Sequence, residues 1–409
     1  MHHPIIYVKL LFLVSCFLLK KYLIPAVIAL VAMTNVAQGA PKPISVKTLK
    51  VFSQSSSAEA IVASSKALFT YENIMGLSAD IKVRAFDFAG TEIWSKTVDS
   101  GLDELATAMT IDSQGTLWLV GNIAIAPQAE SATAVTGALN PDGIEVENLP
   151  PLRADMKNIS VWQISATGEI IGQSSIATVA LIDAISVSSS GLSILASRDN
   201  EPFLITLSQG KFSKELKIGS AKTKLSAVTR GSDGTTYLFG SSSETLGGKK
   251  LVGRVDGALI KIAKTGTITS VVRSSAPKGI RDWQSTTSSL FVTGSVKSGT
   301  TVESAITKFN SSFAPTWTTR ISSTGRTLAS SGANGSFYAI LEPTSAIKGV
   351  TGFKSVKGQL VVLQFDSKGL LISAFTSAEL TSAIASTYSS TAGLFLLTVD
   401  GKIWQVSNS

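Results

Sequence analysis

The chain has 409 residues, of which 44% are hydrophobic and only 16% are charged, and its formal net charge is +8. Its single Cys and both His lie within the first 16 residues, at Cys16, His2 and His3. The rest of the chain therefore excludes disulfides, Ser-His-Asp and Cys-His nucleophile systems, and the usual zinc and copper sites. The abundant Ser, Thr, Gly, Val and Ile favour strands and turns over helices.

Residues 1–39 have the pattern of a targeting region. Lys20 and Lys21 precede an apolar run at 22–33, and the small residues 37–40 follow it. This order of a basic region, an apolar region and a cleavage-like site predicts a signal peptide that is cleaved after Gly39. Cleavage would lower the net charge from +8 to +5, because three lysines and no acids are lost.

A second apolar run, Ile5–Leu19, precedes this signal peptide. It indicates either a misassigned start within 1–19 or a tandem anchor. Leu13–Cys16 resembles a lipoprotein box, in which Cys16 would be acylated. We expect a secreted, periplasmic or cell-surface protein that contacts a membrane only through an uncleaved signal or a lipid anchor.

One hairpin pattern recurs along the remaining chain. An apolar alternating strand is followed by a Gly four residues after its last apolar residue, and then by a second strand. The clearest copies have this Gly at Gly90, Gly168, Gly266 and Gly369. Looser copies turn at Gly210 or through Asn310–Ser312. Alternation predicts the strands, and the glycine predicts a turn residue with positive φ.

A second hairpin precedes each of these copies, most clearly in residues 110–121 and 232–240. Two hairpins make a four-stranded unit, the size of one propeller blade. Seven such units are indicated by their third-strand anchors, which are Phe86, Ile164, Leu207, Ile262, Phe309, Phe365 and Val406.

The last unit holds only three strands, whereas Ile44–Phe52 is a strand left over before the first unit. We therefore expect an all-β, seven-bladed β-propeller with four-stranded blades, closed by the N-terminal strand that completes the last blade. Residues 40–409 would form this single domain, with a loop insertion at 124–158. A β-sandwich or two smaller propellers are the alternatives.

These units resemble the degenerate β-propeller repeats of bacterial exported and surface proteins. The best copies are Asp256–Ile262 with Gly266, and Asp80–Phe86 with Gly90 and Trp94. Residues 112–118 also resemble the turn motif of sensor-type propellers. The resemblance covers roughly 44–406 and implies a fold, because propellers host binding modules and enzymes alike. The family's inner Asp is absent at Gly358 and Ser304, so no binding role follows for Asp256.

Long loops gather on one expected face of the ring, where such scaffolds carry their binding sites. The insertion in the second unit is acidic and holds Glu130, Asp142, Glu145, Glu147 and Asp155. Two other loops are basic, and they hold Lys249, Lys250, Arg254, Lys348, Lys354 and Lys357. One hypothesis is a basic groove that binds an anionic polymer. The alternative is that the acidic insertion neutralises these loops or that all of them are merely solvated.

Asp99, Asp103 and Glu104 form the one candidate cluster for calcium or for acid–base catalysis, with a solvated acidic turn as the alternative. The six Trp, mostly on strands, indicate packing between blades or, alternatively, a carbohydrate platform. The mild charge lacks a basic run, which argues against nucleic-acid binding.

The sequence thus predicts an exported, non-catalytic binding or scaffolding module of the cell envelope, monomeric and without a cofactor. Its partner would be a protein or an anionic or glycan cell-surface polymer. The alternatives are a carboxylate-based polysaccharide enzyme (a glycosidase or lyase) and a structural surface component.

Overall fold

A computed structural model describes residues 43–54, 57–76, 78–125 and 156–408. The expected signal peptide, lipoprotein box and alternative start lie outside these residues, as do all five acidic residues of the 124–158 insertion. Residues 44–409 form one compact unit. Its described residues form thirty strands and one short 3₁₀ helix, η1 (Ala333–Gly335). Among them, no helix has the length and apolar character needed to cross a membrane.

The first two sheets are four-stranded and antiparallel. The first contains β3 (Ala60–Ala63), β4 (Leu68–Met75), β5 (Ala79–Phe86) and β6 (Glu92–Val98). The second contains β7 (Glu104–Ile111), β8 (Leu117–Ile123), β9 (Asn158–Ile164) and β10 (Ile170–Ala177). Within each of these two sheets, every strand pairs with the next along the chain, as two consecutive hairpins require.

The next two sheets repeat this order, with one broken outer strand. The third contains β11 (Leu181–Ser188), β12 (Gly191–Arg198), β13 (Glu201–Ser208), β14 (Lys211–Phe212) and β15 (Leu216–Lys217). The fourth contains β16 (Thr223–Arg230), β17 (Thr236–Ser242), β18 (Asp256–Ile262) and β19 (Ile268–Ser274).

A nine-stranded sheet follows. Its strands are β20 (Ile280–Thr286), β21 (Phe291–Ser298), β22 (Thr301–Phe309), β23 (Pro315–Ser331), β24 (Phe337–Pro343), β26 (Val361–Phe365), β27 (Leu371–Thr376), β1 (Ile44–Thr48) and β25 (Val350–Thr351). The first half of β23 pairs with β22 and its second half pairs with β24. This one strand therefore joins the units that the sequence predicted as the fifth and sixth blades.

The prediction of seven separate four-stranded blades is consequently wrong. Five sheets stand as separate blades, and the nine-stranded sheet replaces the other two. The physical reason is that the chain stays extended through Ser323–Thr327, where the register shifts, instead of leaving one sheet before entering the next. The coarser prediction of an all-β propeller is confirmed.

The last sheet combines the two ends of the described chain. It contains β28 (Ala383–Ser389), β29 (Gly393–Thr398), β30 (Lys402–Val406) and β2 (Lys50–Gln54). The N-terminal strand is divided at Leu49: β2 pairs with β30, whereas β1 lies parallel to β27 and β25. Leu49 is buried, and its amide donates to the carbonyl of Thr376. One segment therefore ties the nine-stranded sheet to the last sheet.

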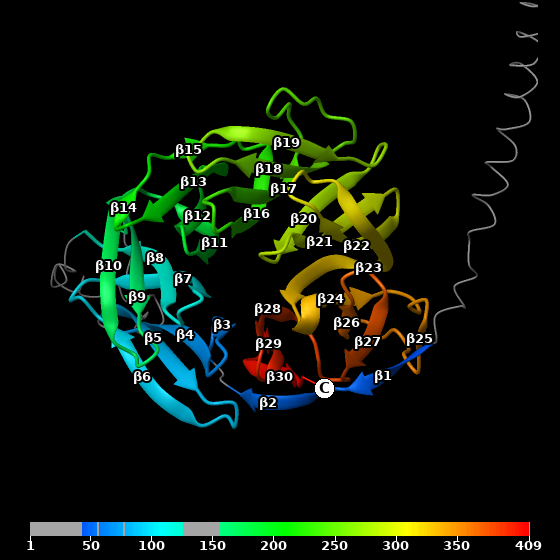
Figure 1. The fold of residues 1–409 in the computed structure, drawn as a ribbon, viewed down its shortest axis with the longest axis horizontal. Helices are drawn as coiled ribbons and strands as arrows, with labels where there is room; N and C mark the ends of the chain where they lie inside the picture. Colours follow the sequence, from blue (N-terminus) through cyan, green and yellow to red (C-terminus); the bar gives the residue numbers. More distant parts are fainter. Residues whose placement is uncertain (1–42, 55–56, 77, 126–155, 409) are drawn as a thin grey trace, which may run out of the picture. The chain divides into compact units, whose positions relative to one another are not determined.

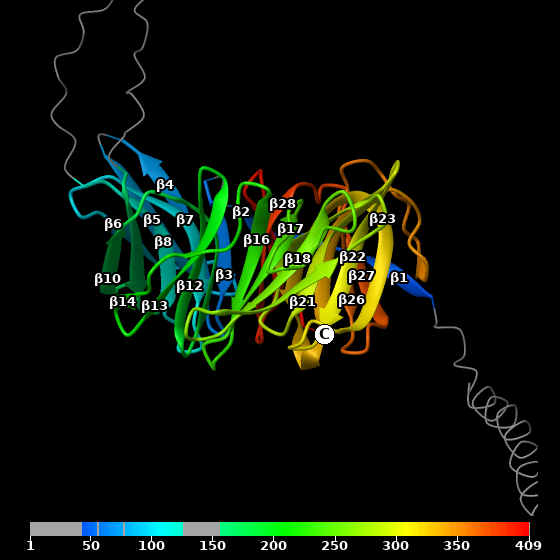
Figure 2. The same ribbon diagram turned by 90° about the horizontal axis from the view of Figure 1, so that it is seen from above.

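The sheets of this unit follow one another around a ring (Figure 1), and Figure 2 shows the ring from the side. The hydrophobic core is divided into clusters that lie mostly between neighbouring sheets. Trp162 of the second sheet packs in a cluster with Phe69 of the first. Leu68 of the first sheet and Phe395 of the last pack in another cluster, which closes the ring. Burial between sheets explains why second and third strands such as β8 and β9 are almost wholly buried.

The turn glycines have the positive φ that the sequence predicted, from +82° at Gly266 to +88° at Gly90. Where the looser copy lacks a glycine, Phe313 takes a φ of +63° instead. At Gly168 there is a second reason for glycine: a Cβ there would lie 2.8 Å from the ring of Trp94. The indole nitrogen of Trp94 donates to the carbonyl of Ala166, so this Trp packs across two sheets as predicted.

Candidate functional site

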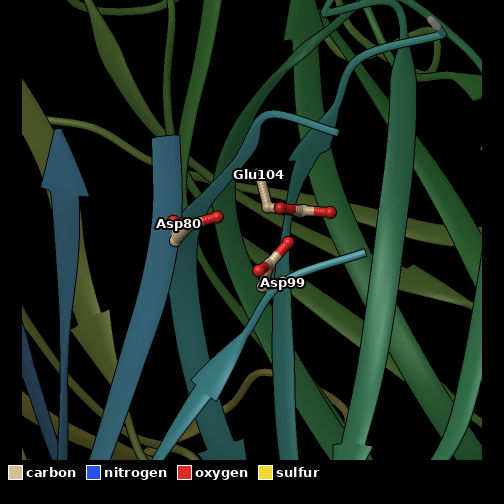
Figure 3. Close-up of side chains that lie close together, drawn as sticks. All are labelled: Asp80, Asp99 and Glu104. Carbon is tan, nitrogen blue, oxygen red and sulfur yellow. The ribbon is translucent and has the colours of Figure 1, made fainter. Parts of the chain in front are cut away.

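Three carboxylates meet where the first sheet leads into the second. Asp80 lies near the start of β5, Asp99 follows β6, and Glu104 is the first residue of β7. One oxygen from each lies within 4.8 Å of the others. Figure 3 shows the carboxylates of Asp80 and Asp99 turned toward that of Glu104. The geometry arises because the start of β5 lies beside the end of β6, where Ile81 pairs with Val98 and the link to β7 begins.

Burial differs sharply within this carboxylate cluster. Glu104 has no exposed surface, Asp80 is half-buried and Asp99 is exposed. The Oε1 atom of Glu104 accepts hydrogen bonds from the backbone amide and the hydroxyl of Ser100. Its Oε2 atom and the Oδ1 atom of Asp80 are buried and have no hydrogen-bond partner among the described residues. Asp99 provides the opening of the cluster to solvent.

The three acidic side chains of the cluster are not balanced by a nearby positive side chain among the described residues. No lysine or arginine among the described residues forms an ion pair with Asp80, Asp99 or Glu104. Burial raises the pKa of Glu104, and the negative charges of Asp80 and Asp99 raise it further, against the opposing hydrogen bonds from Ser100. Such a group is held in an environment that disfavours its charged form unless a cation is added.

Two of the three acidic residues predicted from sequence belong to this cluster, Asp99 and Glu104. Asp103 is buried next to it, where its Oδ1 atom accepts a hydrogen bond from the amide of Ala79 at 2.9 Å. Asp103 therefore holds the start of β5 against the β6–β7 link. Asp80 was missed because it is distant along the chain. The available signal was its position at the start of the strand that pairs with the strand preceding Asp99.

The predicted basic residues Lys249 and Lys250 line a groove of about 820 Å³. Loop residues 247–250 and Val252 form one wall, and six consecutive residues of β19, 268–273, form the other. The strand β19 is the outer edge of its sheet. No carboxylate lines the groove, and both lysines are exposed with no side-chain partner among the described residues.

Two glycines place these lysines beside β19. Gly247 and Gly248 have φ values of +54° and +74° in a tight turn, which is closed by reciprocal backbone hydrogen bonds between Leu246 and Lys249. A Cβ on Gly247 would lie 2.5 Å from the side chain of Val271. Only glycine allows the loop to approach the strand this closely.

Arg273 holds the same loop in place through hydrogen bonds to its backbone. Its side chain is 6% exposed, and it donates to the carbonyls of Lys249 and Ser242, each at 3.2 Å. It also lies 3.8 Å from a carboxylate oxygen of Asp256. The groove wall is thus held by a buried arginine that the sequence did not single out.

The other predicted basic residues lie elsewhere. Arg254 is exposed on the far part of the same loop, where its amide donates to the carbonyl of Gly279. Lys348, Lys354 and Lys357 are exposed on a loop of the nine-stranded sheet, whose short strand β25 pairs with β1. No hydrogen bond or ion pair among the described residues joins the two loops. The basic residues therefore form two separate sets.

Comparison with known proteins assigns the chain to no family: no family model matches it, and no curated protein matches it. A streptogramin B lyase structure is similar over 88% of this chain and 97% of its own, with 12% identity and a TM-score of 0.48. The Cps50 (Swd1) β-propeller domain of Myceliophthora thermophila is similar over 89% and 100%, with 11% identity and a TM-score of 0.49. The Dos1 propeller is similar over 84% of this chain and 76% of its own, with 12% identity and a TM-score of 0.46.

Proposed function

We propose that this β-propeller is an exported, non-catalytic binding module of the cell envelope, related to the propeller repeats of bacterial surface proteins, and that it binds an anionic cell-surface polymer. The observation that carries the proposal is the groove along β19. Its accessible charges, Lys249 and Lys250, are positive, and no acid in its walls neutralises them. A polymer with repeated negative charges complements such a surface.

The shape of the groove also suits an extended ligand. One wall is a single strand seen along its length, so the groove offers successive similar contacts rather than one enclosed pocket. Val252, 68% exposed, adds an apolar contact at its side. A chain molecule can use several such weak contacts at once.

Catalysis on a polysaccharide finds less support. The grouped carboxylates of the described residues include Glu104, which has no exposed surface. A sugar chain cannot reach a general acid that is buried in this way. The enzyme alternative therefore lacks an accessible pair of carboxylates at this cluster, whereas the binding proposal has an open groove.

The test is an array of cell-wall polymers and glycans probed with purified protein, with and without calcium. We expect a selective anionic polymer to bind, and its affinity to fall as salt is raised. The double change Lys249→Ala and Lys250→Ala should weaken binding by about tenfold, since each exposed ion pair contributes up to about 1 kcal/mol. The triple change Lys348→Ala, Lys354→Ala and Lys357→Ala tests the second basic set.

A matched control removes two exposed lysines on other sheets, Lys96→Ala and Lys368→Ala. It should leave binding within about twofold of the unaltered protein, because screening weakens distant charges. A folded protein that binds no anionic polymer would contradict the proposal. So would binding that all three sets of changes weaken equally.

A further inference from the structure

The carboxylate cluster contains two buried oxygens that nothing in the described chain satisfies. The Oε2 atom of Glu104 belongs to a side chain with no exposed surface, and the Oδ1 atom of Asp80 is equally shielded from solvent. A buried acceptor without a partner has lost its hydration without compensation, and the cost is larger when the acceptor is charged. Two such atoms from neighbouring carboxylates indicate that a bound group belongs between them.

The spacing of the oxygens fits one metal ion. Calcium binds oxygen ligands at about 2.3–2.6 Å, so two oxygens on opposite sides of one ion lie at most about 5 Å apart. The three carboxylates of Asp80, Asp99 and Glu104 each supply an oxygen within 4.8 Å of the others. They come from three separate segments, β5, the β6–β7 link and β7, as Figure 3 shows.

We propose that Asp80, Asp99 and Glu104 bind one divalent cation, and that this cation is Ca²⁺. The donor set is all oxygen and carries a formal charge of −3, which suits a hard cation rather than zinc or copper. Three carboxylates supply only part of the six to eight ligands of calcium, and water entering past exposed Asp99 can supply the rest. Mg²⁺ demands a stricter octahedron and should bind more weakly.

The proposed ion would join the first two sheets. Asp80 belongs to the first sheet and Glu104 to the second, and Asp103 already bonds the same strand start through the amide of Ala79. Binding only to the folded arrangement would stabilise this junction by mass action. The site is separate from the basic groove, which lies on the fourth sheet.

The experiment is a calorimetric titration of the purified, metal-stripped protein with CaCl₂ at neutral pH, together with thermal unfolding in calcium and in chelator. We expect one Ca²⁺ per chain, with a Kd in the range of about 10⁻⁵ to 10⁻³ M. Calcium at about 100 times its Kd should raise the melting temperature by several degrees, because it binds the folded chain and not the unfolded one. MgCl₂ should bind more weakly by about tenfold or more.

The key variant is Glu104→Gln, which keeps the shape of the side chain and removes its charge. It should fold, and it should lose calcium binding and the melting shift. Glu92→Gln serves as the matched control, because Glu92 is an exposed acid at the opposite end of β6. It should bind calcium as the unaltered protein does.

Two results would overturn the proposal. One is a folded, unaltered protein that gives neither binding heat nor a melting shift in millimolar calcium, which would mean that a shared proton satisfies the cluster. The other is calcium binding that persists unchanged in both Glu104→Gln and Asp80→Asn, which would place the ion elsewhere.

Discussion

Glu104 and Asp256 are both carboxylates without exposed surface, and both lie at the start of a strand in their sheets. Their surroundings differ. Asp256 accepts hydrogen bonds from the amides of Val252 and Gly253, and Arg273 lies 3.8 Å away. Glu104 has Ser100 on one oxygen, no partner on the other, and two further carboxylates beside it.

This difference separates a structural charge from a candidate binding site. The protein itself satisfies Asp256 with two amides and an arginine, so the loop that carries Lys249 and Lys250 is held in place. The charge of Glu104 is opposed by its neighbours rather than balanced by them. A buried group that the chain leaves unsatisfied, near an opening, is where an added ligand gains the most.

We expect the greatest loss of stability from a change at Asp256. The change Asp256→Ala removes both hydrogen bonds from the backbone amides of Val252 and Gly253. It also leaves the guanidinium of Arg273 buried without its carboxylate. We expect it to lower the free energy of unfolding by about 3–5 kcal/mol, as for other broken buried pairs. Denaturant unfolding measures this change. A loss below about 1 kcal/mol would show that Arg273 is satisfied by the backbone carbonyls alone.

The corresponding change at Glu104 should act in the opposite direction. In chelator, Glu104→Gln removes a buried charge that nothing balances, and it should raise the free energy of unfolding by about 1 kcal/mol. Denaturant unfolding of the variant and the unaltered protein, both without metal, gives the comparison. A large destabilisation instead would mean that Glu104 is as well satisfied as Asp256.

The pH dependence of the unfolding free energy tests the environment of Glu104. Burial and the neighbouring acids raise the pKa of Glu104 in the folded protein. The folded state therefore keeps a proton that the unfolded chain loses near pH 4.3, the ordinary value for glutamate. Without metal, stability relative to Glu104→Gln should fall as pH rises from about 4 through the raised pKa, and then level off. Saturating calcium should remove this fall, and parallel curves in chelator would contradict the assignment.

The smallest effect is expected at Asp99. Because this side chain is exposed, Asp99→Asn should change the unfolding free energy without metal by no more than about 0.5 kcal/mol. It should nonetheless weaken calcium binding by about tenfold, since it removes one of three charged ligands. Parallel calorimetry and unfolding experiments separate these two effects. Unchanged calcium affinity would remove Asp99 from the site.

Much of the fold was predictable because its hairpins are local. Turn glycines such as Gly90 and Gly168 and the alternating strands beside them are specified by short segments. The count of separate blades was not predictable in this way. It depends on whether β23 stays extended between two sheets, which is decided by pairing on both sides of that strand rather than by its own residues.

The site was predictable only in part for a similar reason. Asp99 and Glu104 are close in sequence, so their grouping could be proposed from spacing. Asp80 joins them through the pairing of β5 with β6, and Arg273 reaches Asp256 across the sheet from β19 to β18. Such contacts depend on strand register, which a single sequence specifies weakly.

The most direct test of the cation site is a crystal structure of the protein grown in millimolar calcium, with anomalous scattering recorded to identify the ion. We expect one peak between Asp80, Asp99 and Glu104, at about 2.3–2.6 Å from a carboxylate oxygen of each. A map with no ion there, and with a short hydrogen bond between two of the carboxyl groups, would show that protonation satisfies the cluster and that these residues do not bind calcium.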